Sequence, residues 1–579
     1  MRSTLTRLAA ALVALFAGPV WAAPPLAVEG VRGMVVSAQH LASDAGVAVL
    51  RSGGNAVDAA VAVGYALAVT HPCCGNIGGG GFMLIHLADG RNTFINFREQ
   101  APLAASADMY LDAKGSPVAS RSLDGWLAVG VPGTVLGLET ARTRYGSQSR
   151  AALMAPAIRL AVEGFTLVQG DVDVFAGGNA AFARQANVSA VFLKGGQPLA
   201  VGDRLVQANL ARTLRAISAA GPDAFYRGPI ADAVARASRA GGGLLTRRDF
   251  ERYSITEDAP IRCNYRGYTV LSAPPPSSGG VTLCEMLNIL SGYPLNAWGY
   301  RSAAEVHVMT EAMRRAYHDR NTNLGDPAFV NNPVERLTSP AYAAALRANI
   351  RLDQATRSAV LGPAAAPPEH AQTTHYSVAD RWGNAVSVTY TINDDFGAKV
   401  VAGDTGFLLN DEMDDFTSKP GVPNGFGLVQ GRANAIAPGK RPLSSMSPTI
   451  ILKDGKPVLV VGSPGGARII TTVLEVIVGV IDHHMPLQAA VDAPRFHHQW
   501  LPDTLAAEPE ALTAHTTAAL EALGHHLVPL EPWGAGNSVA AIGIAPHDPA
   551  AALALGFPHP DRLYGANDAR TPAGSAAAP

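Results

Sequence analysis

The sequence predicts a mixed α/β fold, and two patterns support that prediction. Apolar and polar residues alternate on both sides of residues 380–384, which indicates two half-buried strands joined by a tight turn. Residues 37–52 and 55–69 are rich in alanine and valine and apolar on most faces, as expected of helices inside a core. With 579 residues, of which 48% are hydrophobic, the chain can build a large core.

The first 22 residues indicate a secretory signal peptide. Arg2 and Arg7 precede an apolar run at 8–20, and cleavage is expected after Ala22. No later stretch offers about 18 uninterrupted apolar residues, so we expect a soluble, secreted protein without a membrane span, located in a bacterial periplasm. The formal net charge of -2 gives no basic face for nucleic acid, which favours small-molecule partners.

Four cysteines occur in a chain that is expected to enter an oxidising compartment. Cys263 and Cys284 flank an extended segment and a proline-rich turn, so they could face each other as a disulfide. Adjacent Cys73 and Cys74 either form a strained vicinal ring or remain two buried thiols. The spacing of the four cysteines does not suit a zinc site, and no metal site is predicted. Three histidine pairs are expected to be structural or exposed: 483–484, 497–498 and 525–526.

Local signals predict the elements before the hairpin. Asn55 is placed to cap the second apolar helix. The glycine-rich stretch 75–81 lacks the lysine and Ser/Thr of a phosphate-binding loop, so close backbone packing explains it better. Strands are predicted at 82–87 and 93–97, and Arg98 stands at the end of the second. By its position alone, Arg98 would be a surface residue or part of a structural ion pair.

The remaining segments carry weaker signals. Helical patterns dominate 131–214 and 302–355, with breaks at proline and glycine. Residues 361–374 are rich in proline and have the composition of a linker. The last residues, 575–579, are expected to be loosely ordered.

Thr373 begins the first strand of the hairpin. A four-residue loop would put Thr373 opposite Ile392, with Thr391 and Asn393 within about one residue. A threonine hydroxyl keeps its proton at neutral pH and needs a base before it can act as a nucleophile. An α-amino group, with a pKa of about 7.7 to 8.0, is such a base when the threonine is the first residue of a chain. This chemistry requires cleavage between Gln372 and Thr373.

The segment Thr373-Thr374-His375-Tyr376-Ser377-Val378 resembles the gamma-glutamyltranspeptidase family of N-terminal-nucleophile hydrolases, which cut themselves before this threonine. Further motifs of that family occur in the family's order along the chain. Those before Thr373 are 76–83 and 97–99, and those after it are 389–393, 411–416, 440–448 and 462–466. The resemblance implies a four-layer αββα sandwich built as one structural unit. It also implies a large subunit of residues 23–372, a small subunit of residues 373–579, and no cofactor.

The resemblance implies substrate-binding roles for two groups of residues. The α-carboxylate of a γ-glutamyl group would be bound by Arg98, Ser444 and Ser445. Its ammonium group would be held by Asn393, Glu412 and Asp415. The carboxylates at 411–415 could instead bind calcium, but they lack the central glycine and ligand alternation of a calcium loop. Neither serine is followed three residues later by a lysine, so a penicillin-recognising serine nucleophile is not supported.

Catalytic roles follow from the same resemblance. Thr391 would orient the nucleophile, and the backbone N–H groups of Gly465 and Gly466, before a predicted helix, would form an oxyanion hole. Residues 419–432 are similar to the lid of the family. Phe426 stands where a lid tyrosine often lies, so a hydrogen bond that could latch the lid is missing.

The implied activity is γ-glutamyl transfer and glutathione hydrolysis. Thr373 would form a γ-glutamyl ester from glutathione or another γ-glutamyl amide and pass it to water, an amino acid or a dipeptide. Two alternatives remain. An acylase acting on glutaryl or other amides would share the nucleophile but would not bind an ammonium group. A periplasmic binding protein that never cleaves itself would need no threonine at position 373.

Overall fold

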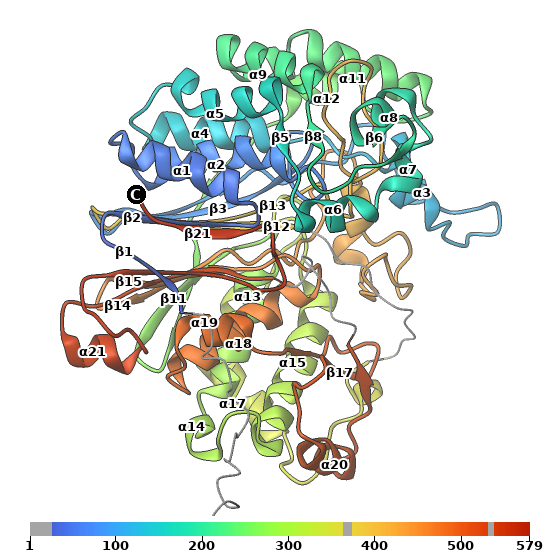
Figure 1. Ribbon diagram of the computed structural model, residues 1–579. Coiled ribbons are helices and arrows are strands. Elements are labelled where there is room, and N and C mark those ends of the chain that lie inside the picture. Colours follow the sequence, from blue (N-terminus) through green and yellow to red (C-terminus); the bar gives the residue numbers. More distant parts are fainter. Residues whose placement is uncertain (1–25, 363–372, 531–537) are drawn as a thin grey trace, which may run out of the picture.

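The computed structural model describes residues 26–362, 373–530 and 538–579 (Figure 1). The predicted signal peptide, Gln372 and most of the predicted linker lie outside the described residues. Within the part of the chain that is described, no helix is both long and apolar enough to cross a membrane.

Two stacked antiparallel sheets, each of seven strands, form the centre of the molecule. The hairpin sheet contains, in spatial order, β21 (Ser575–Ala577), β2 (Gly33–Ser37), β12 (Thr374–Asp380), β13 (Ala385–Thr391), β3 (Gly80–His86), β4 (Asn92–Asn96) and β9 (Thr256–Asp258). The second sheet contains β1 (Val28–Gly30), β20 (Leu563–Asn567), β19 (Ala540–Ile544), β15 (Lys456–Gly462), β14 (Thr449–Lys453), β11 (Tyr268–Ser272) and β10 (Ile261–Tyr265).

Helices cover the outer face of each sheet (Figure 1). The hairpin sheet is covered by α1 (His40–Arg51) and α2 (Ala56–Thr70), with α4 (Thr134–Tyr145), α5 (Arg150–Glu163), α9 (Ala208–Ala220) and α11 (Pro229–Ala240) beyond them. The second sheet is covered by α13 (Gly279–Leu290), α15 (Ala303–Asn323), α17 (Pro340–Ala348), α18 (Arg468–Ile481) and α19 (Leu487–Asp492). The layer order is therefore αββα, which confirms the predicted fold.

Shorter elements connect these layers. The helices are α3 (Ser120–Leu123), α6 (Gln169–Ala176), α7 (Asn179–Phe182), α8 (Ala186–Phe192), α10 (Pro222–Tyr226), α12 (Arg247–Arg252), α14 (Leu295–Trp298), α16 (Val334–Leu337), α20 (Ala514–Leu523) and α21 (Pro549–Ala554). The strands are β5 (Phe165–Thr166), β6 (Leu193–Lys194), β7 (Gln197–Pro198), β8 (Arg204–Leu205), β16 (Phe496–His497), β17 (Leu505–Ala507) and β18 (Leu527–Pro529).

Side chains along the hairpin point alternately to two different environments, one on each face of the sheet. Tyr376, Val378 and Tyr390 belong to the apolar core shared with the outer helices of the hairpin sheet. Residues on the opposite face point to the second sheet, because successive side chains of a strand alternate. Ser377 Oγ, for example, donates to the carbonyl of Ala540 in β19 at 3.0 Å. One hairpin thus joins an apolar layer to a partly polar space between the sheets.

The predicted register of the hairpin is wrong by one residue. Strand pairing runs from Thr374 opposite Tyr390 to Ala379 opposite Ala385, which brings Thr373 opposite Thr391. The loop is one residue shorter than predicted, since the backbone N–H of Asp380 donates to the carbonyl of Asn384 at 3.1 Å. Gly383, with φ of 96°, supplies the left-handed residue that a three-residue hairpin loop needs.

Two further predictions need correction, one at the start of a helix and one at the C-terminus. Residues 37–39 are not helical: β2 ends at Ser37, and α1 begins at His40 with Gln39 as its cap. The last residues are not loosely ordered, because β21 pairs with the edge of β2 through backbone hydrogen bonds. The cap at Asn55 is confirmed, and its Oδ1 accepts from the N–H of Asp58 at 2.9 Å.

Both cysteine pairs form disulfides. Cys263 in β10 is bonded to Cys284 in α13, which ties the second sheet to its helical layer. The neighbours Cys73 and Cys74 form a vicinal ring. Their carbonyl groups accept from the N–H groups of residues 396 and 392, at 2.7 and 3.2 Å, and so hold the segment that follows β13.

Candidate active site

Thr373 and Thr391 meet at the end of the hairpin. Thr373 is only 6% exposed, and its Oγ1 lies 3.2 Å from Oγ1 of Thr391. The Thr391 oxygen also accepts from the backbone N–H of Asn393 at 2.8 Å. Since a hydroxyl can accept and donate at once, Thr391 can still donate its proton to Thr373. The structure therefore brings together the three residues that the sequence predicted at this strand end.

His375 lies behind the threonines in the space between the sheets. Its Nδ1 is 2.8 Å from Thr389 Oγ1, and its Nε2 is 3.1 Å from Ser377 Oγ. Burial lowers the pKa of His375 to about 3, so the imidazole is neutral at physiological pH. Because both ring nitrogens are engaged by hydroxyl groups, this histidine is not placed to take a proton from Thr373.

Arg98 occupies the other side of the site. It follows β4, and its backbone N–H donates to Asn96 Oδ1 at 3.0 Å. The guanidinium group is buried and forms ion pairs with Glu412 and Asp415, which stand on the short 3-10 helix Glu412–Asp415. Its Nε donates to the carbonyl of Pro442 at 3.3 Å. Arg98 is thus a buried ion-pair partner rather than a surface residue.

The charges around Arg98 do not balance. Burial by itself would lower the pKa of Arg98, but the nearby carboxylates of Glu412, Asp415 and Glu99 raise it. Burial raises the pKa of Glu412 and Asp415, and raises that of Glu99 to about 7. Three carboxyl groups lie beside this guanidinium, and Arg320 also acts on Asp415. Because burial raises the pKa values of the carboxyl groups, a further positive charge brought into this region would favour their ionised forms. Sequence reasoning gave Glu99 no role, although it lies in the motif at 97–99.

Asn393 joins the threonines to the carboxylates. It adopts a left-handed conformation with φ of 76°, and its Nδ2 donates to the carbonyl of Asp411 at 3.1 Å. This bond connects the end of β13 to the segment that carries Glu412. Asp414 accepts from Ser122 and Gly425 instead, so it faces away from Arg98.

Ser444 and Ser445 line the same cavity but make different contacts. Ser445 Oγ accepts from Nη2 of Arg320 at 2.8 Å, while Ser444 Oγ accepts from the N–H of Met446 at 3.1 Å. Arg320 also donates from Nε to Ser278 Oγ at 2.9 Å. Burial lowers the pKa of Arg320 to about 10. Arg320 was missed because it lies inside a regular helical pattern, where no local signal marks it.

Gly465 and Gly466 form the turn between β15 and α18. Both have positive φ, 125° and 55°, a region that favours glycine. Their carbonyls accept from the N–H groups of Arg468 and Ile469, which start the helix. Gly466 lines the cavity beside Thr373.

The cavity that unites these groups has a volume of about 20 Å³. Its walls carry Arg98, Thr373, Thr391, Asn393, Glu412, Asp415, Ser444, Ser445 and Gly466. Phe426 and Leu428, from the lid-like segment 419–432, also line it. Phe426 is only 5% exposed, so the segment covers the cavity. A volume of this size holds about one water molecule.

Two clusters among the described residues could hold a metal ion. His71 lies beside Cys73 and Cys74, but these cysteines are joined to each other. The other cluster consists of His307, Glu311 and His525, where His307 Nδ1 lies 2.7 Å from His525 Nε2. Glu311 there forms ion pairs with two arginines, 314 and 315, which disfavour a cation. Neither cluster includes a residue that lines the cavity around Thr373.

Residues 42–578 match the profile of the gamma-glutamyltranspeptidase family. The chain belongs to this family. It is 56% identical over 560 residues to a glutathione hydrolase proenzyme of Pseudomonas sp. (strain A14), with 96% of both chains covered. It is 48% identical over 549 residues to a glutathione hydrolase proenzyme of Escherichia coli (strain K12), covering 94% of this chain and 91% of that protein. The predicted family is confirmed.

Solved structures of the family and of related acylases resemble this one. The crystal structure of gamma-glutamyltranspeptidase from Helicobacter pylori matches with a TM-score of 0.56 and 41% identity, covering 59% of this chain and 96% of that chain. Cephalosporin acylase from Bacillus halodurans matches with a TM-score of 0.83 and 28% identity, covering 96% and 98%. An Acylase ACY 1 proenzyme of Pseudomonas sp. (strain V22) is 42% identical, with 86% of this chain and 88% of that protein covered.

Proposed function

We propose that the protein is a γ-glutamyltransferase and glutathione hydrolase that acts through Thr373 after self-cleavage before that residue. The observation that carries this proposal is the shared cavity, in which the Thr373–Thr391 hydroxyl pair faces Arg98 and an excess of carboxylates. A γ-glutamyl group carries one carboxylate and one ammonium next to each other, so it needs both kinds of partner. Membership of the family and the glutathione hydrolase proenzymes among its relatives support the same activity.

In the proposed reaction, the α-amino group released by cleavage takes the proton of Thr373 Oγ1 as this oxygen attacks the γ-carbonyl carbon. The amide C–N bond then breaks, and the proton passes to the departing amine. A γ-glutamyl ester remains on Thr373. Water, or the amine of an amino acid or dipeptide, attacks this ester and gives its proton to the same α-amino group. The ester C–O bond to Thr373 then breaks, and Oγ1 takes that proton back, which releases the product and restores the enzyme.

Neighbouring groups support the charge changes of this reaction. Thr391 donates a hydrogen bond to Thr373 Oγ1 and orients it. The N–H groups of Gly465 and Gly466 stabilise the oxyanion, a contribution of about 10²-fold or more per donor in other acyl-transfer sites. Arg98, Ser444 and Ser445 bind the substrate α-carboxylate, and Asn393, Glu412 and Asp415 bind its ammonium group. Because the cavity now has room for about one water molecule, these side chains and the lid must move apart to admit a substrate.

The same proposal includes two cleavages of the precursor. Removal of residues 1–22 releases the chain to the periplasm, and the cut before Thr373 produces subunits of residues 23–372 and 373–579. Intact mass and N-terminal sequencing of purified protein test both sites. A small subunit that starts at Thr373, together with a Thr373→Ala variant that stays whole and does not hydrolyse a γ-glutamyl anilide, is the expected result. A wild-type protein that remains one chain would overturn the mechanism, because the proposed base would not exist.

An acylase is the second candidate, supported by the similarity to acylase sequences and structures. It would use the same nucleophile on a glutaryl amide, which lacks the ammonium group. The carboxylates around Arg98 favour the γ-glutamyl substrate. Comparing γ-glutamyl anilide with glutaryl anilide on the cleaved enzyme separates the two, and a higher kcat/KM for the glutaryl compound would favour the acylase.

A further inference from the structure

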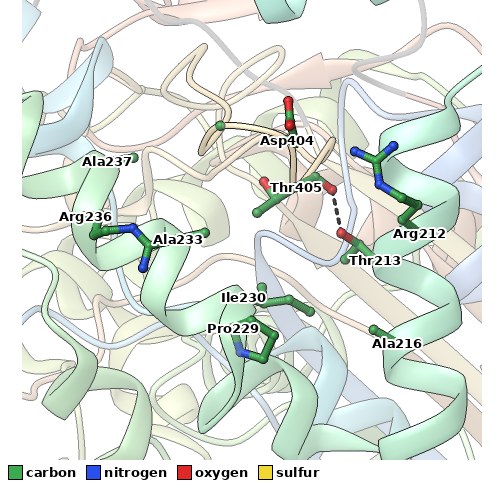
Figure 2. A pocket seen from close by; sticks show the side chains of 11 residues that line it. Arg212, Thr213, Ala216, Pro229, Ile230, Ala233, Arg236, Ala237, Asp404 and Thr405 are labelled. Atoms are coloured by element: carbon green, nitrogen blue, oxygen red, sulfur yellow. Dashed lines mark hydrogen bonds between the residues drawn. The ribbon is translucent and has the colours of Figure 1, made fainter.

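A second hollow lies on the outer helical layer of the hairpin sheet (Figure 2). Helices α9 and α11 form its two walls, and loop residues 403–405 close one end. It shares no lining residue with the cavity around Thr373. Its volume of about 590 Å³ falls within the range of small-molecule sites, roughly 300 to 1,000 Å³.

Two arginines face this hollow from opposite sides. Arg212 comes from α9 and Arg236 from α11; the Arg212 guanidinium points toward the loop that carries Asp404, and that of Arg236 lies along α11 (Figure 2). Within the described residues, the structure records no ion pair or side-chain hydrogen bond for either. The surface between them is apolar and includes Ala216, Ile230 and Ala233. Two unpaired guanidinium groups across an apolar floor suit a molecule with a carboxylate at each end of a short hydrocarbon chain.

The loop supplies two further polar groups. Thr405 is 6% exposed, and its Oγ1 is buried without a hydrogen-bond partner. Its carbonyl accepts from Thr213 Oγ1 at 2.7 Å, which fixes the loop on α9. Asp404 is exposed at the rim and makes no ion pair within the described part of the chain. A buried unpartnered hydroxyl gains a bond when a ligand arrives, and the Asp404 carboxylate attracts an ammonium group.

Glycine packing shows that the loop is held in place before any ligand binds. Gly406 has φ of 79°, and a Cβ atom there would lie 2.3 Å from the backbone nitrogen of Leu210 in α9. Asn187 also donates to the carbonyl of Gly403 at 2.9 Å. The loop backbone is therefore fixed before binding, whereas the two exposed arginine side chains lose rotamer freedom when they bind a ligand.

We propose that this hollow binds an α-amino dicarboxylic acid, of which glutamate is the simplest probe. One carboxylate contacts Arg212 and the other Arg236, the methylene chain lies on the apolar floor, and the ammonium group faces Asp404. The hydroxyl of Thr405 donates to a carboxylate. This inference goes beyond the proposed catalytic function and uses none of its residues.

Two double variants of equal charge test the arginines. Arg212→Ala/Arg236→Ala removes the pair that faces the hollow, while Arg215→Ala/Arg239→Ala removes exposed arginines of the same helices that do not line it. Calorimetry with L-glutamate on the purified protein is expected to show one site at this hollow in wild type and the control variant, separate from any binding at the cavity around Thr373. In the first variant this site weakens by about tenfold or more, since each carboxylate loses a charge-assisted partner. Equal binding by both variants, with both folded by thermal melting, would overturn the proposal.

A third variant tests the ammonium contact. Asp404→Asn should weaken glutamate binding at this site and strengthen binding of glutarate, which has no amine, so that the preference changes by about tenfold. If Asp404→Asn binds both glutamate and glutarate as wild type does, the assignment of an amino acid is overturned. Both measurements report binding rather than turnover, so they stand even where the proposed catalytic function fails.

Discussion

The two sides of the cavity around Thr373 are built by different forces. Thr373 and Thr391 are neutral side chains on neighbouring strands, and backbone pairing between β12 and β13 fixes their positions. Arg98 follows β4, whereas Glu412 and Asp415 stand on one 3-10 helix, and buried charge attraction holds the two segments together. If the proposed roles are correct, changes to the threonine side should slow the chemical steps, whereas changes to the charged side should weaken substrate binding and the fold.

The largest effect is expected from Arg98→Leu. This change leaves Glu412 and Asp415 buried without their cation, which costs about 3 to 5 kcal/mol when one partner of a buried pair is lost. Arg98→Lys is the matched control, because it keeps the charge but not the planar fork. We expect Arg98→Lys to cleave itself normally and to raise KM for a γ-glutamyl anilide by about 10²-fold, with little change in kcat. Urea unfolding and steady-state kinetics provide the measurements, and an unchanged KM in Arg98→Lys would contradict the assigned role.

Thr391→Val should give the opposite pattern. Valine has nearly the same shape but no hydroxyl, so Thr373 Oγ1 loses a partner and the N–H of Asn393 loses its acceptor. We expect self-cleavage and kcat to fall by about 10- to 10²-fold, with KM within about twofold. Thr391→Ser keeps the hydroxyl and should retain most of the activity. A rise in KM without a fall in kcat would show that the two sides are not separate.

The pH dependence of stability provides a smaller test of the threonine side. Burial keeps the pKa of His375 at about 3 in the folded protein, below the usual value of 6.5. Between these values the unfolded chain binds a proton that the folded protein does not, so stability is complete above pH 6.5 and falls as pH drops toward 3. The loss amounts to about 1.4 kcal/mol per pH unit. In His375→Asn, urea unfolding between pH 4.5 and 7.5 should show a slope smaller by about this amount. An identical slope in both proteins would mean that His375 does not titrate in this way.

Local signals predicted much of the fold. The cap at Asn55 and the alternating faces of the hairpin depend only on neighbouring residues, so the sequence was sufficient for them. The register was missed by one residue because a three-residue loop with left-handed Gly383 and a four-residue loop give similar patterns. The strand at the C-terminus depends on the free edge of β2, a partner more than 500 residues away that no local pattern reveals.

In the site, too, local motifs were predicted, whereas contacts between distant parts of the chain were not. Family motifs pointed to the polar side chains on the cavity wall but not to Arg320, which stands behind one of them. Arg320, which binds Ser445, lies on a helix over 100 residues earlier in the chain, and no periodicity distinguishes it from its helical neighbours. The vicinal bond between Cys73 and Cys74 was one of two alternatives left open. The sequence could not decide between them, because two adjacent cysteines give the same local pattern whether they are bonded or free.

The smallest effect is expected from Phe426→Tyr, which tests whether the lid belongs to the charged side. The Phe426 ring is buried against the cavity, and its carbonyl accepts from Gln499 Nε2 at 3.4 Å. A tyrosine hydroxyl there must find a partner, since an unpaired buried hydroxyl is unfavourable, and the carboxylates of the cavity are acceptors. One such bond is worth about 0.5 to 1.5 kcal/mol, so a latched lid should exclude water from the γ-glutamyl ester and raise the ratio of transfer to hydrolysis by about threefold.

The ratio is measured with a γ-glutamyl anilide and a dipeptide acceptor, with Phe426→Leu as a control that has neither ring nor hydroxyl. If tyrosine, phenylalanine and leucine give the same ratio, the lid does not govern access to the ester, and the charged side ends at Arg98 and its carboxylates.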